Sequence, residues 1–324
     1  MRRLRAALTA VALSAIALGA PALGSAEPAR AVKVTVLSTM LAGNPGRGIG
    51  EWGFAALIEA DGRRLLFDAG ERPDTVLRNA GELGIDLSGV TDLVITHNHP
   101  DHTGGLVTLR RELARTNARA LARAHVARGI FDRRPRADGS DDNGLLPLKA
   151  AYEALDGQFV EHAGPAQLLP GVWLTGPVPR QHAERNWSGS GRVQTAGGLV
   201  EDTIAEDASV IVDTADGLIV VSGCGHAGII NTIEYARKVV RAAPVLAAIG
   251  GFHLLAANDA TLEWTGNKLN AFGLRYLLGA HCTGLEAVYR LRTMLGLTRQ
   301  TAVVAAVGSS FTSGTGITAL ILAG

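Results

Sequence analysis

Three histidines and one aspartate lie within six positions of the chain, at His97, His99, Asp101 and His102. Imidazole nitrogens and carboxylate oxygens are ligands that zinc, iron and manganese accept in proteins. In an extended segment alternate side chains share a face, so His97 and His99 can bind one ion from the same side. Asp101 and His102 follow the turn at Pro100 and can reach a second ion. The spacing therefore predicts a site for divalent metals.

The residues before this cluster predict the element that positions it. Leu93, Val94 and Ile95 form a short apolar run typical of a buried strand, and the cluster begins two residues later. A loop that leaves a buried strand is aimed by a rigid sheet, and functional residues concentrate on such loops. Three imidazoles kept together without metal would repel one another on protonation, which favours metal binding over a purely structural role.

Several segments resemble one family of enzymes. Residues 96–105, which contain the cluster, resemble the H-x-H-x-D-H signature of the metallo-β-lactamase fold superfamily of metal-dependent hydrolases. Residues 222–228 and 250–254 are similar to the G-C-S-H-A-G and G-G-F-H-L motifs of its dihydropterin-aminobenzene phosphate synthase-like branch. Residues 280–284 and 175–180 resemble that branch's C-H-C-T-G and T-G-x-I-P-R motifs. The match covers nearly the whole chain after residue 26.

The resemblance implies an α/β fold, a four-layer αββα sandwich with the site along one edge of its two sheets. It also implies the ligands of two ions: His97, His99 and His226 for one, and Asp101, His102 and His281 for the other. Many members of the superfamily have a bridging aspartate where this chain has Cys224, so Cys224 is a further candidate ligand. The residues leave open whether its thiolate bridges the ions, whether His226 takes over, or whether only one ion binds tightly.

Other residues are candidates to contact the substrate. Arg180 carries a guanidinium that matches phosphate or carboxylate groups, and His182 either lines the same pocket or faces solvent. By the resemblance, His253 contacts the substrate or stabilises a leaving group, and Thr283 lies in the segment that carries the last ligand. Asp68 resembles an aspartate that braces the metal loop through hydrogen bonds, although a plain turn residue fits the sequence equally well.

This donor set predicts a metal-dependent hydrolase. Two divalent ions lower the pKa of a shared water, so that a metal-bound hydroxide forms near neutral pH, and Asp101 can orient it. Zinc is the default metal for an exported histidine-rich site, and manganese or iron also suit a carboxylate ligand. The resemblance to the dihydropterin-aminobenzene phosphate synthase-like branch implies a phosphate-bearing substrate, so a phosphoester is favoured ahead of a lactone or an amide. The alternatives are a dihydropterin-type synthase and a non-catalytic metal- or ligand-binding protein.

Some polar residues fit structural roles better than functional ones. His125 and His162 are predicted to be structural histidines. Four arginines of a helix predicted for residues 105–118 are assigned to its solvated face: Arg110, Arg111, Arg115 and Arg119. Four acids precede a predicted strand: Glu201, Asp202, Glu206 and Asp207. Most of them are assigned to a solvated edge, and one is a candidate to bind a metal or to accept a hydrogen bond from a ligand. Residues 132–144 are predicted to form an exposed loop near the pocket.

The apolar pattern predicts the remaining elements. Asp61 and Gly62 separate two strands of a hairpin within residues 54–67. Helical spacing or strand patterns cover the following segments: helices at 74–83, 231–242 and 285–295, an amphipathic segment at 269–277, and strands at 32–38, 244–249 and 302–307.

The first 26 residues are typical of a secretory signal peptide. Arg2, Arg3 and Arg5 precede an apolar stretch of about 13 residues, and small residues at 24–26 form a cleavage site. The apolar stretch is shorter than the roughly 20 residues that span a bilayer. We therefore expect residues 27–324 to be exported, periplasmic or secreted, as a single domain without a membrane anchor.

The charge and the cysteines narrow the range of partners. Removing residues 1–26 takes away three of the 31 basic residues and none of the 30 acidic ones, which leaves a net charge near −2. This balance does not favour nucleic acid, so the expected partner is a small-molecule substrate. Cys224 and Cys282 are the only cysteines of the sequence. An exported chain could pair them as a disulfide, but metal binding competes for both.

Overall fold

Two packed β-sheets form the centre of the computed structural model, which describes residues 27–184, 186 and 191–321. Within these residues eight strands form the first sheet, in the spatial order β17 (Gly316–Thr318), β16 (Ser310–Thr312), β1 (Val32–Ser38), β2 (Ala55–Ala60), β3 (Arg63–Phe67), β4 (Asp92–Ile95), β5 (Arg123–Ala127) and β6 (Gln158–His162). The second sheet has the order β15 (Ala302–Val304), β14 (Tyr276–Gly279), β13 (Val245–Gly250), β12 (Gly217–Ser222), β11 (Ser209–Thr214), β8 (Val172–Leu174) and β7 (Ala166–Leu169). A separate hairpin consists of β9 (Arg192–Thr195) and β10 (Gly198–Glu201).

The facing sides of the two sheets bury a shared apolar core. Alternate residues of β1, Val34 and Val36, point into this core, as do Val210 and Val212 of β11. The period of two follows from the pleat of a strand, which sends neighbouring side chains to opposite faces. Each fully buried valine stabilises the fold by about 1.5–3 kcal/mol relative to an exposed one, so this core holds the sheets together.

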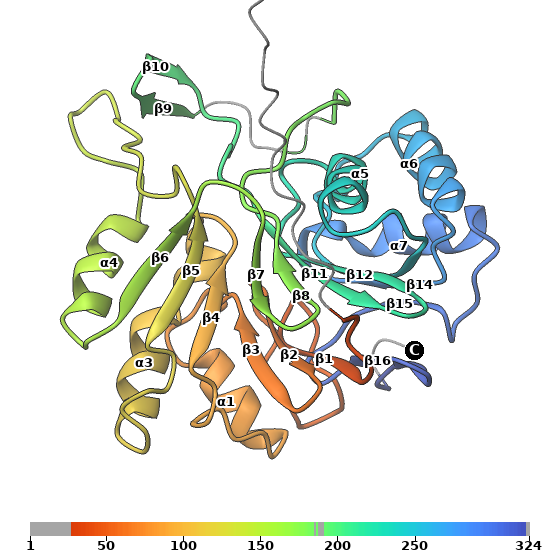
Figure 1. The fold of residues 1–324 in the computed structure, drawn as a ribbon, viewed down its shortest axis with the longest axis horizontal. Coiled ribbons are helices and arrows are strands. Elements are labelled where there is room, and N and C mark those ends of the chain that lie inside the picture. Colours follow the sequence, from red (N-terminus) through yellow and green to blue (C-terminus); the bar gives the residue numbers. More distant parts are fainter. Residues whose placement is uncertain (1–26, 185, 187–190, 322–324) are drawn as a thin grey trace, which may run out of the picture.

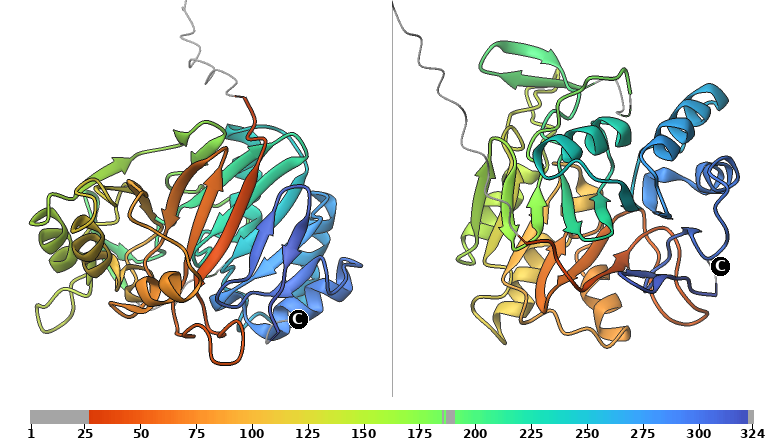
Figure 2. Two further views of the ribbon diagram at one scale, coloured as in Figure 1. Left: turned by 90° about the horizontal axis from the view of Figure 1, so that it is seen from below. Right: turned by 45° about the vertical axis from the view of Figure 1, so that its right-hand side comes forward.

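Helices cover the outer faces of both sheets (Figures 1 and 2). Those that pack on the first sheet are α1 (Thr75–Glu82), α3 (Leu106–Ala114) and α4 (Leu145–Glu153). Those that pack on the second sheet are α5 (Ile229–Val239), α6 (Asp259–Ala271) and α7 (Leu285–Met294). Two single turns, α2 (Pro100–Thr103) and the 3₁₀ helix η1 (His281–Thr283), lie at strand ends. The layers confirm the predicted four-layer αββα sandwich.

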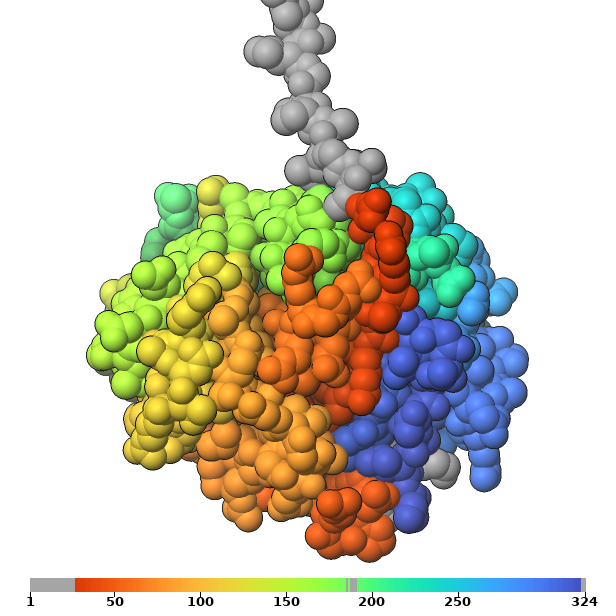
Figure 3. Space-filling model, turned by 60° about the horizontal axis from the view of Figure 1, so that its bottom comes forward, coloured from red at the N-terminus to blue at the C-terminus, as the bar shows by residue number. Residues whose placement is uncertain are grey.

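Both ends of the described chain meet in the first sheet. β1 pairs antiparallel with β16, with Lys33 opposite Thr312. Figure 3 shows the N-terminal and C-terminal segments, red and blue, side by side on the surface. Among the described residues, no helix combines the length and the apolar character that a membrane span requires. The predicted signal peptide lies outside the described residues.

The hairpin prediction is confirmed, and three helix predictions need correction, of which one is α5, which covers residues 229–239 instead of 231–242. Asp61 and Gly62 both have positive φ, 49° and 78°, as a tight two-residue turn between β2 and β3 requires. α3 ends at Ala114 instead of Ala118. α6 covers residues 259–271, whereas the sequence predicted an amphipathic segment at 269–277 that here runs from the end of α6 into β14.

One arginine of α3 is buried instead of solvated. Arg110 is only 3% exposed, and its guanidinium donates hydrogen bonds to the carbonyl oxygens of Ala118, Ala120 and Leu155. These carbonyl groups belong to the loop after α3 and to the end of α4, and no local sequence pattern connects them. Arg110 therefore fastens two connections together, which corrects its predicted place on the solvated face.

Candidate metal centre

Strand ends from both sheets bring the candidate ligands to one edge of the sandwich. The first sheet supplies residues 97–102, directly after β4. The second sheet supplies residues 224–226 after β12, His253 after β13 and His281 after β14. His99 is extended, with φ −67° and ψ 145°, and the single turn of α2 begins at the next residue. This change of direction separates His97 and His99 from the two ligands within α2.

Two sets of metal-donor atoms lie beside each other at this edge. Within each set the donor atoms lie within 4.8 Å of one another. The first set is His97, His99 and His226, and the second is Asp101, His102, Cys224 and His281. The sets adjoin, since the ring centroids of His97 and His102 are 4.3 Å apart. The structure thus brings together all six residues that the sequence predicted as ligands, and it places Cys224 in the second set.

Several ring nitrogens of these sets are buried without a hydrogen-bond partner among the described residues. They are Nε2 of His97, Nε2 of His226 and both ring nitrogens of His281. Leaving a buried polar atom unsatisfied costs about 1–3 kcal/mol, and proteins seldom do so. An ion that accepts these lone pairs removes the cost. Imidazoles, one carboxylate and one thiol are donors that zinc and similar divalent ions bind, so the residues fit such ions.

Burial favours the metal-binding form of the first set. Together with repulsion from the neighbouring imidazoles, burial holds the pKa of His97 and the pKa of His226 well below the usual value for histidine. Burial also lowers the pKa of His99, to about 4. These rings are therefore neutral at physiological pH, with a lone pair for an ion.

The second set has a different charge balance. Burial disfavours a charged His102, but the carboxylates of Asp101 and Asp68 outweigh burial and raise the pKa of His102 to about 9. Burial alone would raise the pKa of Asp101, yet the surrounding histidines His102, His281 and His99 hold it below its usual range. An ion that binds here must displace a proton, which makes binding depend on pH.

Two ligand histidines are oriented by polar groups behind them. Nδ1 of His102 donates to a carboxylate oxygen of Asp68 at 2.7 Å, and the other oxygen of Asp68 accepts the backbone N–H of Thr96 at 2.8 Å. Nδ1 of His226 donates to the carbonyl oxygen of Asn186 at 2.5 Å. With the proton on Nδ1, Nε2 of each ring faces the candidate ion. The contacts of Asp68 confirm the prediction that it braces the metal loop.

Three residues of this region adopt a left-handed backbone conformation. The φ angles of Asp68, His253 and His281 are 55°, 48° and 46°. For residues that carry a Cβ atom, such angles cost of order 1–3 kcal/mol and persist only where the surroundings enforce them. The backbone is therefore held in a strained form at three positions beside the donors, and four other non-glycine residues of the described chain share this conformation.

The two cysteines touch but are not bonded. Their Sγ atoms lie 3.3 Å apart, whereas a disulfide requires about 2.05 Å, and both thiols are free. The Sγ atom of Cys224 also lies 3.3 Å from Nε2 of His102. This position suits a thiolate ligand of the second ion, and Cys282 forms a further group of close donor atoms with Cys224 and His253.

Arg180 contacts backbone carbonyl groups. Its guanidinium donates to the carbonyl oxygens of Thr203, Ile204 and His226. It lines neither cavity beside the donors. Arg180 therefore fastens the segment that carries His226, and its contact with an anionic group of a substrate stays a prediction.

The remaining predicted substrate contacts divide into two kinds. Thr283 is buried, and its hydroxyl donates to the carbonyl oxygen of Gly250 and accepts the N–H of Phe252, so it positions the segment before His253. His253 and His182, in contrast, line cavities.

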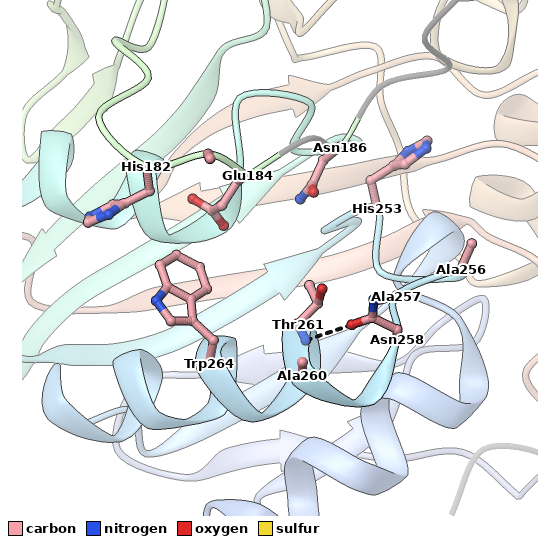
Figure 4. Close-up of a pocket in the computed structure, with 11 residues that line it drawn as sticks. His182, Glu184, Asn186, His253, Ala256, Ala257, Asn258, Ala260, Thr261 and Trp264 are labelled. Carbon is pink, nitrogen blue, oxygen red and sulfur yellow. Dashed lines mark hydrogen bonds between the residues drawn. The ribbon is translucent and has the colours of Figure 1, made fainter.

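Two adjoining cavities open beside the donor sets. The smaller, about 400 Å³, is lined by Trp52, Glu71 and five of the seven donors, which are His99, Asp101, Cys224, His226 and His281. The larger, about 720 Å³, is lined by residues that include His182 and Trp264 (Figure 4). His253 lines both cavities, which places it where they join.

Trp52 is a site residue that the sequence reasoning missed. Its ring centroid lies 4.6 Å from that of His281, and 42% of the residue is exposed. A large aromatic side chain left this open beside a polar site is suited to contact a ligand. The available signal was a single tryptophan within the glycine-rich loop at residues 43–53. Trp264 was missed as well, because α6 was predicted only in part.

The acids before β11 are mostly buried, which corrects the predicted solvated edge. Arg134 is also buried, and its guanidinium pairs with Asp202 at 2.6 Å and with Glu206 at 2.7 Å. Asp207 accepts the backbone N–H of Ala227 at 3.0 Å, beside His226. Residues 132–144 are therefore anchored through Arg134, and they line neither of the two cavities beside the donors.

The fold and the paired donor sets identify the class of protein. Residues 53–238 match the sequence profile of the metallo-beta-lactamase superfamily (Lactamase_B). The profile covers more than half of the chain, and the chain belongs to this superfamily.

Individual relatives agree with this assignment. The chain is 28% identical over 266 residues to the 7,8-dihydropterin-6-methyl-4-(beta-D-ribofuranosyl)-aminobenzene-5'-phosphate synthase of Methanocaldococcus jannaschii. This match covers 79% of this chain and 89% of the synthase. The structure of a metal-dependent hydrolase of the beta-lactamase superfamily, Tm1679, superposes with a TM-score of 0.66 at 26% identity, covering 86% of this chain and 98% of that one. Zinc-bound PqqB from Methylobacterium extorquens shares the fold, with a TM-score of 0.52 at 15% identity over 86% of this chain and 99% of that one.

Proposed function

We propose that this chain is an exported metal-dependent hydrolase that cleaves a phosphoester. The observation that carries the proposal is the pair of adjoining donor sets beside an open cavity, with buried ring nitrogens that lack partners among the described residues. Export is proposed from residues 1–26 of the sequence alone. Intact protein retained in the cytoplasm with residues 1–26 still attached would contradict export without affecting the enzymatic proposal.

Each side chain of the centre has a proposed role. The two donor sets would hold divalent ions, zinc by preference, which when bound lower the pKa of water and polarise the bond to be cut. The carboxylate of Asp101 accepts a hydrogen bond from the attacking water and orients it. His253, at the junction of the cavities, lies beside the departing group and can hold a proton at a ring nitrogen.

A phosphoester is favoured over a lactone or an amide for two reasons. The two donor sets would concentrate positive charge at one point, which suits an oxygen-rich anionic group. In addition, the relative from Methanocaldococcus jannaschii is named for an aminobenzene 5'-phosphate compound.

The same relative supports a second candidate function, a dihydropterin-type synthase. Its similarity extends over 79% of this chain, further than the profile of the superfamily alone. A synthase would yield a product that contains both the dihydropterin and the aminobenzene phosphate, whereas a hydrolase would yield an alcohol and phosphate, so product analysis separates the two functions. A non-catalytic metal- or ligand-binding protein is the third reading, and it would be supported by less than one ion per chain together with no turnover.

The test is a panel of phosphoesters, lactones and amides, offered to the wild type and to His99→Ala. We expect phosphate release by the wild type, and a loss of at least about 100-fold in kcat/KM for His99→Ala, because one ligand of the first set is gone. Asp216→Ala is the control, since Asp216 lies at an exposed turn outside both donor sets. Hydrolysis that survives both His99→Ala and removal of metal would refute the proposal.

A further inference from the structure

The larger cavity adjoins the metal centre. His253 is common to both cavities, and its ring centroid lies 4.7 Å from that of His226 in the first donor set. Figure 4 shows His253 at one end of the larger cavity, with His182 and Trp264 toward the other. A substrate whose reacting group is held at the donors, and which extends past His253, therefore enters this cavity. Its volume of about 720 Å³ lies within the range of cavities that bind small organic molecules.

The far wall of this cavity is aromatic and held in place. The rings of Trp264 and His182 meet edge to face, with centroids 5.4 Å apart. Nε2 of His182 lies 2.9 Å from a carboxylate oxygen of Glu234, and Lys268 pairs with the other oxygen at 3.4 Å. Lys268 also lies 5.9 Å from the centroid of the Trp264 indole. Since these partners already fix the wall, little side-chain entropy is lost when a ligand packs on Trp264.

Small and polar residues complete the cavity. Ala256, Ala257 and Ala260 present only methyl groups, which leaves room for a ligand beside the indole. The side chain of Asn258 accepts the N–H of Thr261, as a helix cap does, and both residues line the cavity. This cap keeps the amide group of Asn258 in a fixed orientation, where its NH₂ group is available to heteroatoms of a ligand.

We infer that this cavity binds the departing part of the substrate, and that this part is a flat aromatic group packed against Trp264. The inference rests on the proposed function and adds the class of phosphoester: an ester of an aromatic alcohol, instead of a purely aliphatic one. No substrate contact has been assigned to Trp264 by the sequence motifs, which end before α6 and resume after it.

Hydrolysis of two matched esters tests the inference. Benzyl phosphate and propyl phosphate release alcohols of similar basicity, so a change in their ratio reports on binding of the ring. Trp264→Ala should lower kcat/KM about tenfold for benzyl phosphate and less than about twofold for propyl phosphate, while Trp264→Phe should retain most of the preference. Tyr289→Ala removes an exposed aromatic ring of α7 outside the cavity and should change neither value.

A second variant protects the test against misfolding. Ala260 is exposed on α6, so Ala260→Leu should fold normally and fill the cavity. It should also reduce the preference for benzyl phosphate. Equal losses for both esters in Trp264→Ala and Ala260→Leu would overturn the inference.

Binding without chemistry separates this inference from the proposed function. Saturation-transfer NMR with 2-naphthylmethanol, which has no bond to hydrolyse, should show contact with the wild type and with Tyr289→Ala, and loss of contact in Trp264→Ala. Cyclohexylmethanol should give a weaker signal. If no ester is hydrolysed but these signals appear, the cavity assignment stands and the proposed reaction fails. If the signals are the same in wild type and Trp264→Ala, the cavity assignment fails, whatever the enzyme does.

Discussion

Asp68 shows how a residue without a place in either donor set controls the metal centre. One carboxylate oxygen holds Nδ1 of His102, and the other holds the backbone of Thr96, next to His97. Asp68 is fully buried and its own backbone is strained, so its contacts leave little freedom. The orientation of His102 therefore depends on this one side chain.

We predict that Asp68→Ala weakens binding at the second donor set about 10- to 100-fold, because Nδ1 of His102 loses its partner and the ring its fixed orientation. The first set should keep its affinity. Competition with a chromophoric chelator measures both affinities. Asp216→Ala, at an exposed turn, is the control. Equal affinities in wild type and Asp68→Ala would show that His102 is oriented by other contacts.

Arg180 gives a second prediction at the scale of the residue, because a role in substrate binding and a role in stability have different effects when the side chain is replaced. Removal of a substrate clamp would raise KM. Removal of a side chain that donates to three backbone carbonyl oxygens would instead lower the free energy of unfolding. Unsatisfied carbonyl groups cost about 1–3 kcal/mol each when buried.

We expect Arg180→Met to lower the free energy of unfolding by about 2 kcal/mol or more and to leave KM nearly unchanged. Urea unfolding and steady-state kinetics on the same preparation measure both quantities. A variant with wild-type stability and a KM at least tenfold higher would restore the anion clamp predicted from the sequence.

At the scale of the element, three neighbouring strands are joined by a polar cluster away from the metal centre. Asp92 of β4 accepts two hydrogen bonds from Arg123 of β5, at 2.7 and 2.8 Å, and lies 2.9 Å from Nε2 of His125. Nδ1 of His125 lies 3.0 Å from Nε2 of His162 in β6. The two histidines thus have the structural setting predicted for them. β4 ends next to the metal loop, so this cluster supports the element that positions His97.

This cluster should make stability depend on pH. Burial would raise the pKa of Asp92, but hydrogen bonds from His125, Arg123 and Thr91 outweigh burial and hold the pKa below its usual range. A lowered carboxyl pKa contributes stability above the unfolded-state pKa of about 4, and this contribution is lost as the pH falls below that value.

We predict that Asp92→Asn lowers the free energy of unfolding by about 2 kcal/mol at pH 7, and that its difference from the wild type shrinks between about pH 4.5 and pH 3. Urea unfolding at a series of pH values measures this difference. The exposed Asp216→Asn is the control. A difference that stays constant down to pH 3 would show that ionisation of Asp92 does not contribute.

At the scale of the whole molecule, the centre exists only because two sheets pack together. The first sheet supplies His97 to His102, and the second supplies Cys224, His226 and His281. Each donor set contains residues from both sheets, which are more than a hundred positions apart in the sequence. Ions bound here would therefore connect the two halves of the sandwich and stabilise the folded state by mass action.

The sequence predicted the parts of this arrangement that depend on local pattern. The ligand types, the strand ends and the turn at Asp61 each depend on residues that are close together in the sequence. The structure brings the predicted ligands together in two donor sets. Arg110, Arg134 and Arg180 could not be placed in this way, because their partners lie far along the chain and a guanidinium suits solvent, carbonyl oxygens or an anion equally well. α6 was predicted only in part because few of its residues are buried, although Asn258 provided a start signal.

The central claim is that two donor sets, each built from both sheets, hold one divalent ion apiece. Elemental analysis of the purified protein, compared with His226→Ala, His281→Ala and the control Asp216→Ala, tests it most directly. The account predicts about two ions per chain in the wild type and the control, and about one in each of the other variants. Fewer than one ion per chain in the wild type, or the same count in all four proteins, would contradict it.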